Sequence, residues 1–267
     1  MAAMRSEGEA EVATIRLEGG KANAMTSDLL DTIERAIDEF ERSPARAAVL
    51  TGYDRFFSAG LALPKLVGLD RPAMHVFIER FGRTMMRVFA CEKPVIAAIN
   101  GHAIAGGCVL ALMCDWRVFV DEPGARIGLN EVQLGIGLPA IVVEPLRCSV
   151  PATSLVPIAL EGRLFSPVEA LAIGLVHAVS PAAELADRAH AKAAELAALP
   201  PLAVTQIKRA LRGPIIDAVA RTQAVETERW LDSWFAPDAR ARLEAAVSSW
   251  GQAPLDQPGG VQPREIR

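Results

Sequence analysis

The chain is poor in aromatic residues, which make up 5% of its 267 residues and include a single tyrosine. It also lacks a CxxC pair and any histidine–cysteine cluster with the spacing of metal ligands. We therefore expect neither a metal site nor a disulfide framework. The cysteines are expected to be reduced thiols, and they are Cys91, Cys108, Cys114 and Cys148.

Basic runs and long apolar runs are also missing. The formal net charge is −4 and the isoelectric point is about 5.7, which argues against a nucleic-acid partner. No stretch of roughly 20 apolar residues predicts a membrane span. The first 12 residues contain no apolar signal-peptide region, so a cytoplasmic location is expected. The absence of GxGxxG and GxxxxGK[ST] patterns disfavours Rossmann-type nucleotide binding and nucleotide hydrolysis.

Hydrophobic residues make up 51% of the chain, enough for a large core, and their spacing predicts an α/β fold. Strands and helices alternate over the first two thirds, and helices fill the last third. Residues 56–63 are predicted to form a loop of small residues. Strands are predicted at 12–17, 47–51, 95–100, 117–120 and 127–129. Helices are predicted at 26–42, 72–89, 106–113, 138–146, 201–211, 215–234 and 238–250.

Two short loops have the residue types of a ligand-binding backbone. Phe57-Ser58-Ala59-Gly60-Leu61 follows a predicted buried strand, and its small residues allow close approach of a ligand. Ala105-Gly106-Gly107-Cys108 opens a predicted helix, whose N-terminus offers unpaired N–H groups. Such donors can stabilise negative charge that develops on a carbonyl oxygen. Either loop alone would be ordinary turn chemistry.

Five motifs together resemble the crotonase (enoyl-CoA hydratase/isomerase) superfamily, in order and in rough spacing. The resemblance covers about residues 12–250, nearly the whole chain. Within the superfamily, the segment Ile127-Gly128-Leu129-Asn130-Glu131-Val132-Gln133-Leu134-Gly135-Ile136 is most similar to mitochondrial-type enoyl-CoA isomerases. The motifs are Lys21-Ala22-Asn23-Ala24-Met25, Phe57-Ser58-Ala59-Gly60-Leu61, Lys93-Pro94-Val95-Ile96-Ala97-Ala98-Ile99-Asn100-Gly101, Ala105-Gly106-Gly107-Cys108 and Cys114-Asp115.

The resemblance implies a spiral of ββα repeats over residues 1–195 and a C-terminal helical oligomerisation region over 196–250. A mobile tail is expected at 251–267. Relatives of this kind form homotrimers or hexamers built from trimers. They act on acyl-CoA or acyl-carrier thioesters, with coenzyme A as part of the substrate and no separate cofactor.

The resemblance also implies the residues of the site. The backbone N–H groups of Leu61 and Gly106 would form an oxyanion hole for the thioester oxygen. Contacts with the substrate are expected from Ala24, Ala59, Gly107, Val109 and Lys208.

The number of carboxylates separates the reactions of the superfamily. Hydratases carry one glutamate three residues after the oxyanion-hole glycine, where this chain has Val109, and a second where it has Glu131. Hydration requires a water to be oriented and protons to be both removed and delivered, whereas an allylic shift needs a single base. From spacing alone Glu131 would be an ordinary solvated loop carboxylate. Asp115, Glu122 and Glu144 are other possibilities; Asp115 is expected to be structural.

Basic residues for the coenzyme A phosphates are less well defined. Lys208 and Arg209 lie in a helical stretch that often supplies charge to the 3′-phosphate in relatives, although a solvated basic face is equally consistent. Lys21 and Lys65 are weaker candidates. A phosphopantetheine arm on a carrier protein would use the same tunnel.

Other side chains have a structural and a functional interpretation. His102 precedes the second loop, where packing or capping is favoured over contact with the thioester. No Ser-His-Asp set is evident, which disfavours a triad hydrolase. Trp230 and Trp234 are one helical turn apart, and core or subunit packing is favoured over lining an acyl pocket.

The leading hypothesis is an isomerase that shifts a C3 double bond to C2 with Glu131 as acid and base. One alternative is a hydratase or another enolate-forming lyase of the superfamily with a substitute acid. A second is a non-catalytic thioester-binding protein, for which Val109 and Ala62 would be signs of decay. Ala62 stands where the isomerase branch has an acidic residue. The acyl chain and the pathway are left open.

Overall fold

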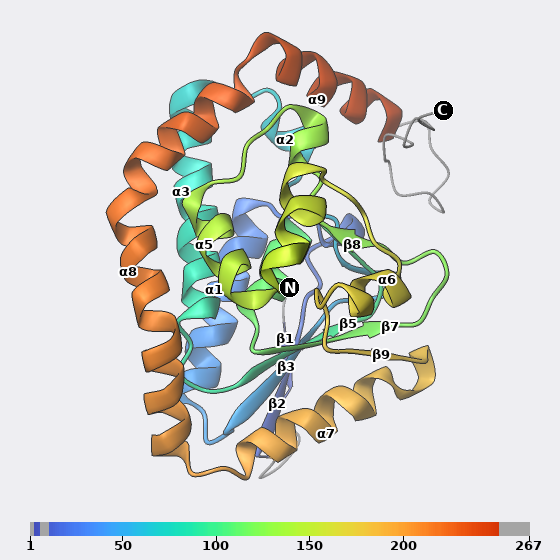
Figure 1. The fold of residues 1–267 in the computed structure, drawn as a ribbon, viewed down its shortest axis with the longest axis vertical. Helices are drawn as coiled ribbons and strands as arrows, with labels where there is room; N and C mark the ends of the chain where they lie inside the picture. Colours follow the sequence, from blue (N-terminus) through green and yellow to red (C-terminus); the bar gives the residue numbers. More distant parts are fainter. Residues whose placement is uncertain (1–2, 6–10, 251–267) are drawn as a thin grey trace.

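The computed structural model describes residues 3–5 and 11–250; the predicted tail and segment 6–10 lie outside this range. Strands and helices alternate up to α7, and helices follow (Figure 1). The strands are β1 Ala3–Arg5, β2 Val12–Arg16, β3 Ala47–Thr51, β4 Phe56–Ser58, β5 Val95–Ile99, β6 His102–Ile104, β7 Trp116–Val120, β8 Ile127–Gly128 and β9 Ala178–Ser180. The helices are α1 Ser27–Arg42, α2 Leu63–Leu66, α3 Arg71–Phe89, α4 Gly106–Met113, α5 Ala140–Ser149, α6 Pro167–Ala172, α7 Leu185–Ala197, α8 Pro201–Trp234 and α9 Pro237–Trp250.

The strands form a larger and a smaller sheet. The larger sheet has the order β1-β2-β3-β5-β7-β9, in which only the β1–β2 pair is antiparallel, and the smaller has the order β4-β6-β8, all parallel. Every residue of β5 is buried, as expected for a parallel strand covered on both faces. The α/β fold class expected from the sequence is confirmed. In the smaller sheet, β4 includes the first two residues of the first small-residue loop, and β6 ends directly before the second.

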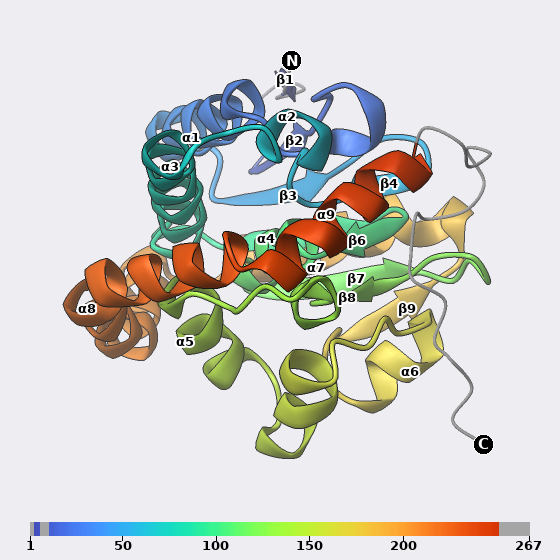
Figure 2. The ribbon, with the colours of Figure 1, turned by 90° about the horizontal axis from the view of Figure 1, so that it is seen from above.

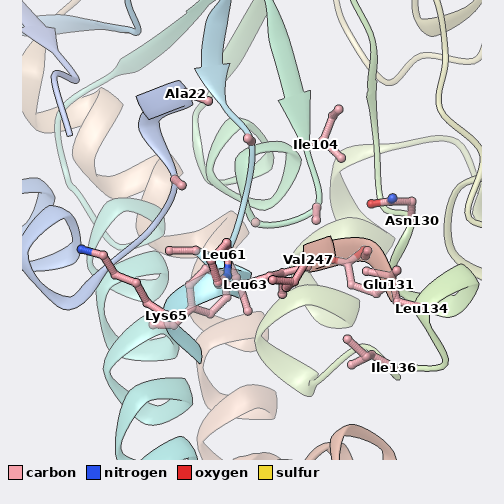
Figure 3. A pocket seen from close by; sticks show the side chains of 18 of the residues that line it. Ala22, Leu61, Leu63, Lys65, Ile104, Asn130, Glu131, Leu134, Ile136 and Val247 are labelled. Atoms are coloured by element: carbon pink, nitrogen blue, oxygen red, sulfur yellow. The ribbon is translucent and has the colours of Figure 1, made fainter. Parts of the chain in front are cut away.

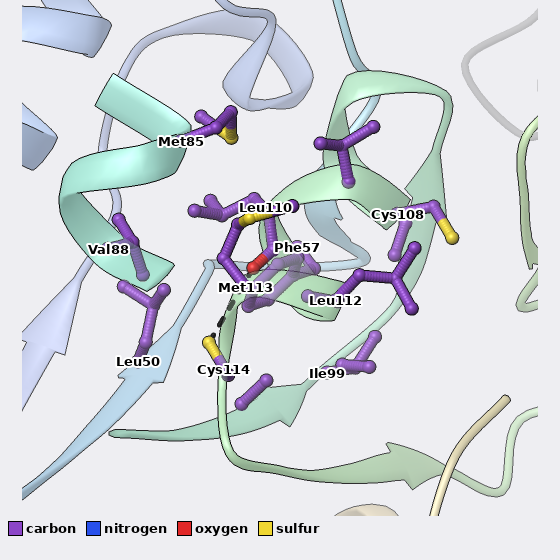
Figure 4. Close-up of a cluster of buried hydrophobic side chains, with 14 of the residues drawn as sticks. Leu50, Phe57, Met85, Val88, Ile99, Cys108, Leu110, Leu112, Met113 and Cys114 are labelled. Atoms are coloured by element: carbon purple, nitrogen blue, oxygen red, sulfur yellow. Dashed lines mark hydrogen bonds between the residues drawn. The ribbon is translucent and has the colours of Figure 1, made fainter. Parts of the chain in front are cut away.

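Helix α4 is the centre of the hydrophobic core. All eight of its residues are buried, and it packs against α3, α5, β4 and β6. Figure 4 shows Leu110, Leu112 and Met113 of α4 between Val88 on one side and Ile99 on the other. Because the helix is apolar on every side, it is surrounded by protein. Its N-terminus, at Gly106, is therefore held at a fixed place in the core.

Two corrections to the sequence prediction concern residues 56–63 and helix α8. Residues 56–63 were expected to form a loop, yet they contain strand β4, which pairs with a further strand, β6, that was not predicted. The predicted helices 201–211 and 215–234 are a single helix, α8, which continues through Pro214. Lys208 and Arg212, one turn apart, both bind Asp115 at 2.7 and 2.8 Å. These contacts hold the helix in place just before the proline, so tertiary packing outweighs the local cost of proline.

The last two helices pack against the same chain. Helix α8 runs beside α3 and α5 (Figure 1), and α9 returns from its end across the molecule to contact α2 and η2, the 3₁₀ turn Glu131–Leu134 (Figure 2). Gly135 has φ +79°, and a Cβ there would lie 3.0 Å from the Cα of Ala239. Helix α9 can therefore pack this closely only against a glycine. In the part of the chain that is described, no helix has both the length and the apolar character needed to cross a membrane.

Candidate functional site

A pocket of about 950 Å³ opens at the N-terminus of α4. Its walls come from the segment before α1, the β4–α2 and β6–α4 loops, η2, and helices α3, α5, α8 and α9. Figure 3 shows Leu61 and Glu131 bordering the same cavity, with Lys65 and Ile136 at opposite ends. Most of the lining side chains are apolar, so few of them can form hydrogen bonds with the polar groups in the pocket.

The N–H of Leu61 points away from the neighbouring chain segment and towards the pocket. Met25 and Leu61 form a parallel bridge, in which the C=O of Gly60 accepts from Met25 N at 2.7 Å and Ala62 N donates to Met25 O at 3.1 Å. In a trans peptide, C=O and N–H point in opposite directions. Since the C=O of Gly60 faces Met25, the N–H of Leu61 faces the other way, and it has no hydrogen-bond partner among the described residues.

The N–H of Gly106 is directed by the same rule. The C=O of Ala105 accepts from Val109 N at 3.0 Å, along the axis of α4. The N–H of Gly106 therefore points outward from the helix N-terminus, where no described residue binds it. Ala105 has φ +50° and ψ −120°, a strained conformation for alanine that turns the chain into the helix.

The two loops that carry these N–H groups are in contact. A Cβ built on Gly60, whose φ is +84°, would lie 3.0 Å from Gly106 N and 2.7 Å from Ile104 O. A Cβ on Gly107 would lie 2.1 Å from Ser58 O. Parallel strands β4 and β6 bring both loops to one edge of the smaller sheet. Side by side, the two amides can donate to one oxygen atom.

Gly107→Ala is expected to destabilise the protein severely, because its Cβ would overlap the backbone oxygen of Ser58, and a backbone atom cannot move aside cheaply. We expect a loss of more than about 3 kcal/mol in the free energy of unfolding. Gly68→Ala is the matched control, since a Cβ there meets nothing within 4 Å. Denaturant unfolding of both variants tests this; equal stabilities would contradict the packing described.

Glu131 is the first residue of η2 and borders the pocket next to Asn130. Its Oε2 atom is buried, without a hydrogen-bond partner among the described residues. Burial raises the pKa of Glu131 to about 7, although a hydrogen bond from its own backbone N–H acts in the opposite direction. A carboxyl group with such a pKa exchanges protons readily at neutral pH.

The raised pKa has a consequence for stability. The folded protein holds the Glu131 proton with a pKa of about 7, against 4.5 for an unperturbed glutamate. The free energy of unfolding is therefore expected to fall as the pH rises from about 4.5 to about 7. Glu131→Gln removes this effect, so it should be more stable than the wild type at pH 8, by on the order of 3 kcal/mol, and not at pH 4.5. Thermal melts at both pH values test this; a constant difference would contradict it.

Glu131 is the only carboxylate among the described lining residues. Val109, buried in the first turn of α4, lines the same pocket. Glu144 lies outside the lining, 3.6 Å from Arg147. Asp115 binds Val95 N, Lys208 and Arg212, which is a structural role. No cluster of three or more histidine, cysteine, aspartate or glutamate residues within the described ranges could hold a metal ion.

The expected substrate contacts are only partly brought together. Ala24 and Ala59 line the pocket together with Val109. Gly107 does not, and its Cα packs against Ser58. Lys208 also lies outside the lining. Substrate contact by these two residues stays a prediction.

The amino group of Lys208 is hydrogen-bonded to other parts of the chain. It lies 2.7 Å from Asp115 Oδ2 and 2.8 Å from Lys93 O, outside the pocket lining. Lys21 and Lys65, the weaker candidates, do line the pocket, as does Arg242 of α9. Sequence reasoning missed Arg242 because no local pattern places α9 over the pocket.

Two tryptophans of α8 line the pocket as well as packing in the core. Trp230 and Trp234 stack with ring centroids 5.2 Å apart, and both are buried. The sequence favoured core packing of these tryptophans over lining an acyl pocket, but in the structure they do both. His102 lies outside the lining; its ring packs 5.3 Å from Phe56, which agrees with the packing role.

Comparison with known proteins agrees with this fold. A family model described as enoyl-CoA hydratase/isomerase matches residues 7–242. Mitochondrial enoyl-CoA delta isomerase 1 of Mus musculus is 32% identical over 192 residues, which cover 71% of this chain and 65% of that protein, just under two thirds of its length. Short-chain-enoyl-CoA hydratase of Clostridium acetobutylicum is 30% identical over 244 residues, 90% of this chain and 93% of that one.

Among solved structures, human mitochondrial delta3-delta2-enoyl-CoA isomerase superposes with a TM-score of 0.90 at 24% sequence identity, covering 94% of this chain and 98% of that one. The crotonase-type α/β fold with a C-terminal helical region, expected from the resemblance, is confirmed. The chain belongs to the enoyl-CoA hydratase/isomerase family. Isomerases and hydratases both occur among these relatives, so the names do not distinguish the two reactions.

Proposed function

We propose that this protein is an enoyl-CoA isomerase that moves a double bond from C3 to C2 of an acyl thioester. The observation that carries the proposal is the single carboxylate of the described pocket lining, Glu131, with Val109 where hydratases of the family have a second one. One base suffices for an allylic shift, whereas water addition needs a water to be held and protons to be both taken and given.

The reaction uses the two amides and the carboxylate in turn. The thioester oxygen accepts hydrogen bonds from Leu61 N–H and Gly106 N–H, and the Glu131 carboxylate removes a proton from C2. The C2–H electron pair forms a C1=C2 bond while the thioester C=O electrons move onto the oxygen, so the resulting dienolate, conjugated with C3=C4, carries its charge on that oxygen. When the C=O bond re-forms, the C1=C2 electrons form the C2=C3 bond and the C3=C4 electrons bind a proton at C4. Glu131 returns the proton at C4. No oxidant, reductant or water is consumed.

The surroundings suit each step. The apolar lining keeps bulk water from the dienolate and strengthens the hydrogen bonds to its oxygen. With a pKa near 7, Glu131 is ionised often enough to act as a base and acidic enough to return the proton.

The thioester carrier is proposed to be coenzyme A. Lys21, Lys65 and Arg242 border the pocket and can pair with its phosphates. The acyl chain would extend between Ile136, Trp230 and Trp234, an apolar end suited to hydrocarbon. Assembly as a trimer or hexamer remains a prediction from the family.

Parallel incubation with a 3-enoyl-CoA and a 2-enoyl-CoA tests the proposal. We expect the 3-enoyl thioester to be converted to the conjugated 2-enoyl form, which is followed by its ultraviolet absorbance, and the 2-enoyl thioester to gain no water. Hydration of the second without migration in the first would make the protein a hydratase. Tight binding without deuterium exchange at C2 in deuterated water would make it a non-catalytic thioester-binding protein.

A further inference from the structure

The hydroxyl of Ser58 connects two backbone segments directly behind the pocket. Ser58 Oγ donates to Asn23 O at 2.8 Å and accepts from Gly60 N at 3.2 Å. Ser58 is fully buried, so no water competes for these hydrogen bonds. The hydroxyl therefore fixes the direction of the Gly60 N–H, one peptide before the Leu61 amide.

Asn23 holds the other end of this bridge. Its φ is +48°, and its side-chain amide donates to Leu17 O at 3.0 Å and to Phe57 O at 3.2 Å. Its Oδ1 accepts from Gly19 N at 2.7 Å. Asn23 is fully buried with all these groups satisfied, so its carbonyl is a rigid acceptor for Ser58.

The bridge reaches both amides of the site. The hydroxyl of Ser58 holds Gly60 N–H while Met25 holds Gly60 C=O at 2.7 Å, so the peptides on both sides of the Gly60 Cα are fixed, the second of which carries the Leu61 N–H. The main-chain oxygen of Ser58 rests on the Cα of Gly107, next to Gly106. One residue thus links the segments that carry the Leu61 and Gly106 N–H groups.

We propose that Ser58 is a positioning residue whose hydroxyl, held by Asn23, aligns the Leu61 N–H with the Gly106 N–H for a shared oxygen anion. This inference rests on the proposed function in so far as a thioester oxygen lies between the two amides. Ser58 itself touches no substrate: it is absent from the pocket lining, and its effect passes through the Gly60–Leu61 peptide. Pre-aligned donors stabilise developing charge without reorganising during the reaction.

The experiment measures the oxyanion site directly with acetoacetyl-CoA, a 3-oxoacyl thioester whose enolate absorbs in the near ultraviolet. Binding between two amides should favour the enolate, lowering the apparent pKa at which the bound ligand ionises. Ser58→Ala is expected to reduce this preference about tenfold, close to the effect of one well-placed hydrogen bond. Ser180→Ala is the matched control: Ser180 is fully buried, and its hydroxyl has no partner among the described residues.

Turnover of a 3-enoyl-CoA should change in the same way. We expect Ser58→Ala to lower kcat about tenfold with little change in KM and an unchanged pH midpoint, because the base is untouched. Ser58→Cys, which retains a weak donor and acceptor of similar size, should lie between alanine and wild type, and it decides the question if the alanine variant does not fold.

The outcomes separate this inference from the proposed function. Wild-type enolate stabilisation and kcat in both Ser58 variants would overturn the inference and leave the isomerase proposal standing. Enolate formation that depends on Ser58, without any double-bond migration by the wild type, would support the inference and overturn the isomerase. A wild type that does not favour the enolate would overturn the inference, whatever the variants do.

Discussion

Glu131→Gln is expected to lower kcat for a 3-enoyl-CoA about a thousandfold, within the range that a positioned acid–base group contributes. The amide keeps the size of the side chain but can neither take a proton from C2 nor return it at C4. No other carboxylate lies in the described pocket lining to replace it. Substrate binding should persist, because the Leu61 and Gly106 amides are unchanged.

The pH dependence of the wild type is part of the same expectation. Because the pKa of Glu131 is raised to about 7 by burial, the carboxylate is half ionised near neutral pH in the free protein. We expect kcat/KM to fall about tenfold per pH unit below that value and to level off above it. A pH–rate profile and a steady-state comparison with Glu144→Gln, a half-buried glutamate outside the pocket, provide the test. Near wild-type turnover of Glu131→Gln would exclude this residue as the base.

The local sequence was sufficient for most individual elements. Apolar runs such as 95–100 predict buried strands because both faces of a parallel sheet are covered, and β5 is fully buried. The Ser-x-x-Glu pattern at Ser166–Glu169 predicts a capping box, which the structure contains, with Glu169 N donating to Ser166 Oγ at 3.4 Å and Ser166 N to Glu169 Oε2 at 2.8 Å. These features depend on neighbours in the sequence, which a pattern can identify.

Elements held by distant contacts were missed. Strands β4 and β6 have three residues each, too short for a clear alternation; they exist because they pair with one another, and β6 also pairs with β8. The break expected near Pro214 is absent because Lys208 and Arg212 bind Asp115 across the fold. Local propensity was outweighed in both cases by tertiary structure.

The site shows the same division. Its two loops could be singled out from their glycines, and the family resemblance implied that they share an oxyanion hole. Their contact follows from the parallel pairing of β4 and β6, which was not predicted. The position of Arg242 depends on the packing of α9 against η2, which no hydrophobic periodicity in the sequence indicates. Lys208 was assigned to substrate because a basic residue on a helix gives no sign of a buried carboxylate partner such as Asp115.

Val109→Glu is expected to introduce water addition to a 2-enoyl-CoA, with a rate about a hundredfold above that of the wild type. Val109 is buried in the pocket wall one turn after Gly106, on the same face of α4, so a carboxylate there would share the pocket with Glu131. Two carboxylates can hold a water molecule between them and divide the proton transfers that hydration requires.

The same substitution should destabilise the fold and reduce isomerisation, because a second buried charge near Glu131 raises the pKa of the pair. Val109→Gln is the matched control: it adds similar volume and polarity but no proton-transferring group, and it should not hydrate. Product analysis of both variants with a 2-enoyl-CoA, at equal folded fraction, distinguishes the effect of the carboxylate from the effect of the added volume. If folded Val109→Glu adds no water, the missing carboxylate is not what distinguishes this pocket from a hydratase, and the choice between the reactions must depend on how the apolar walls hold the acyl chain against Glu131.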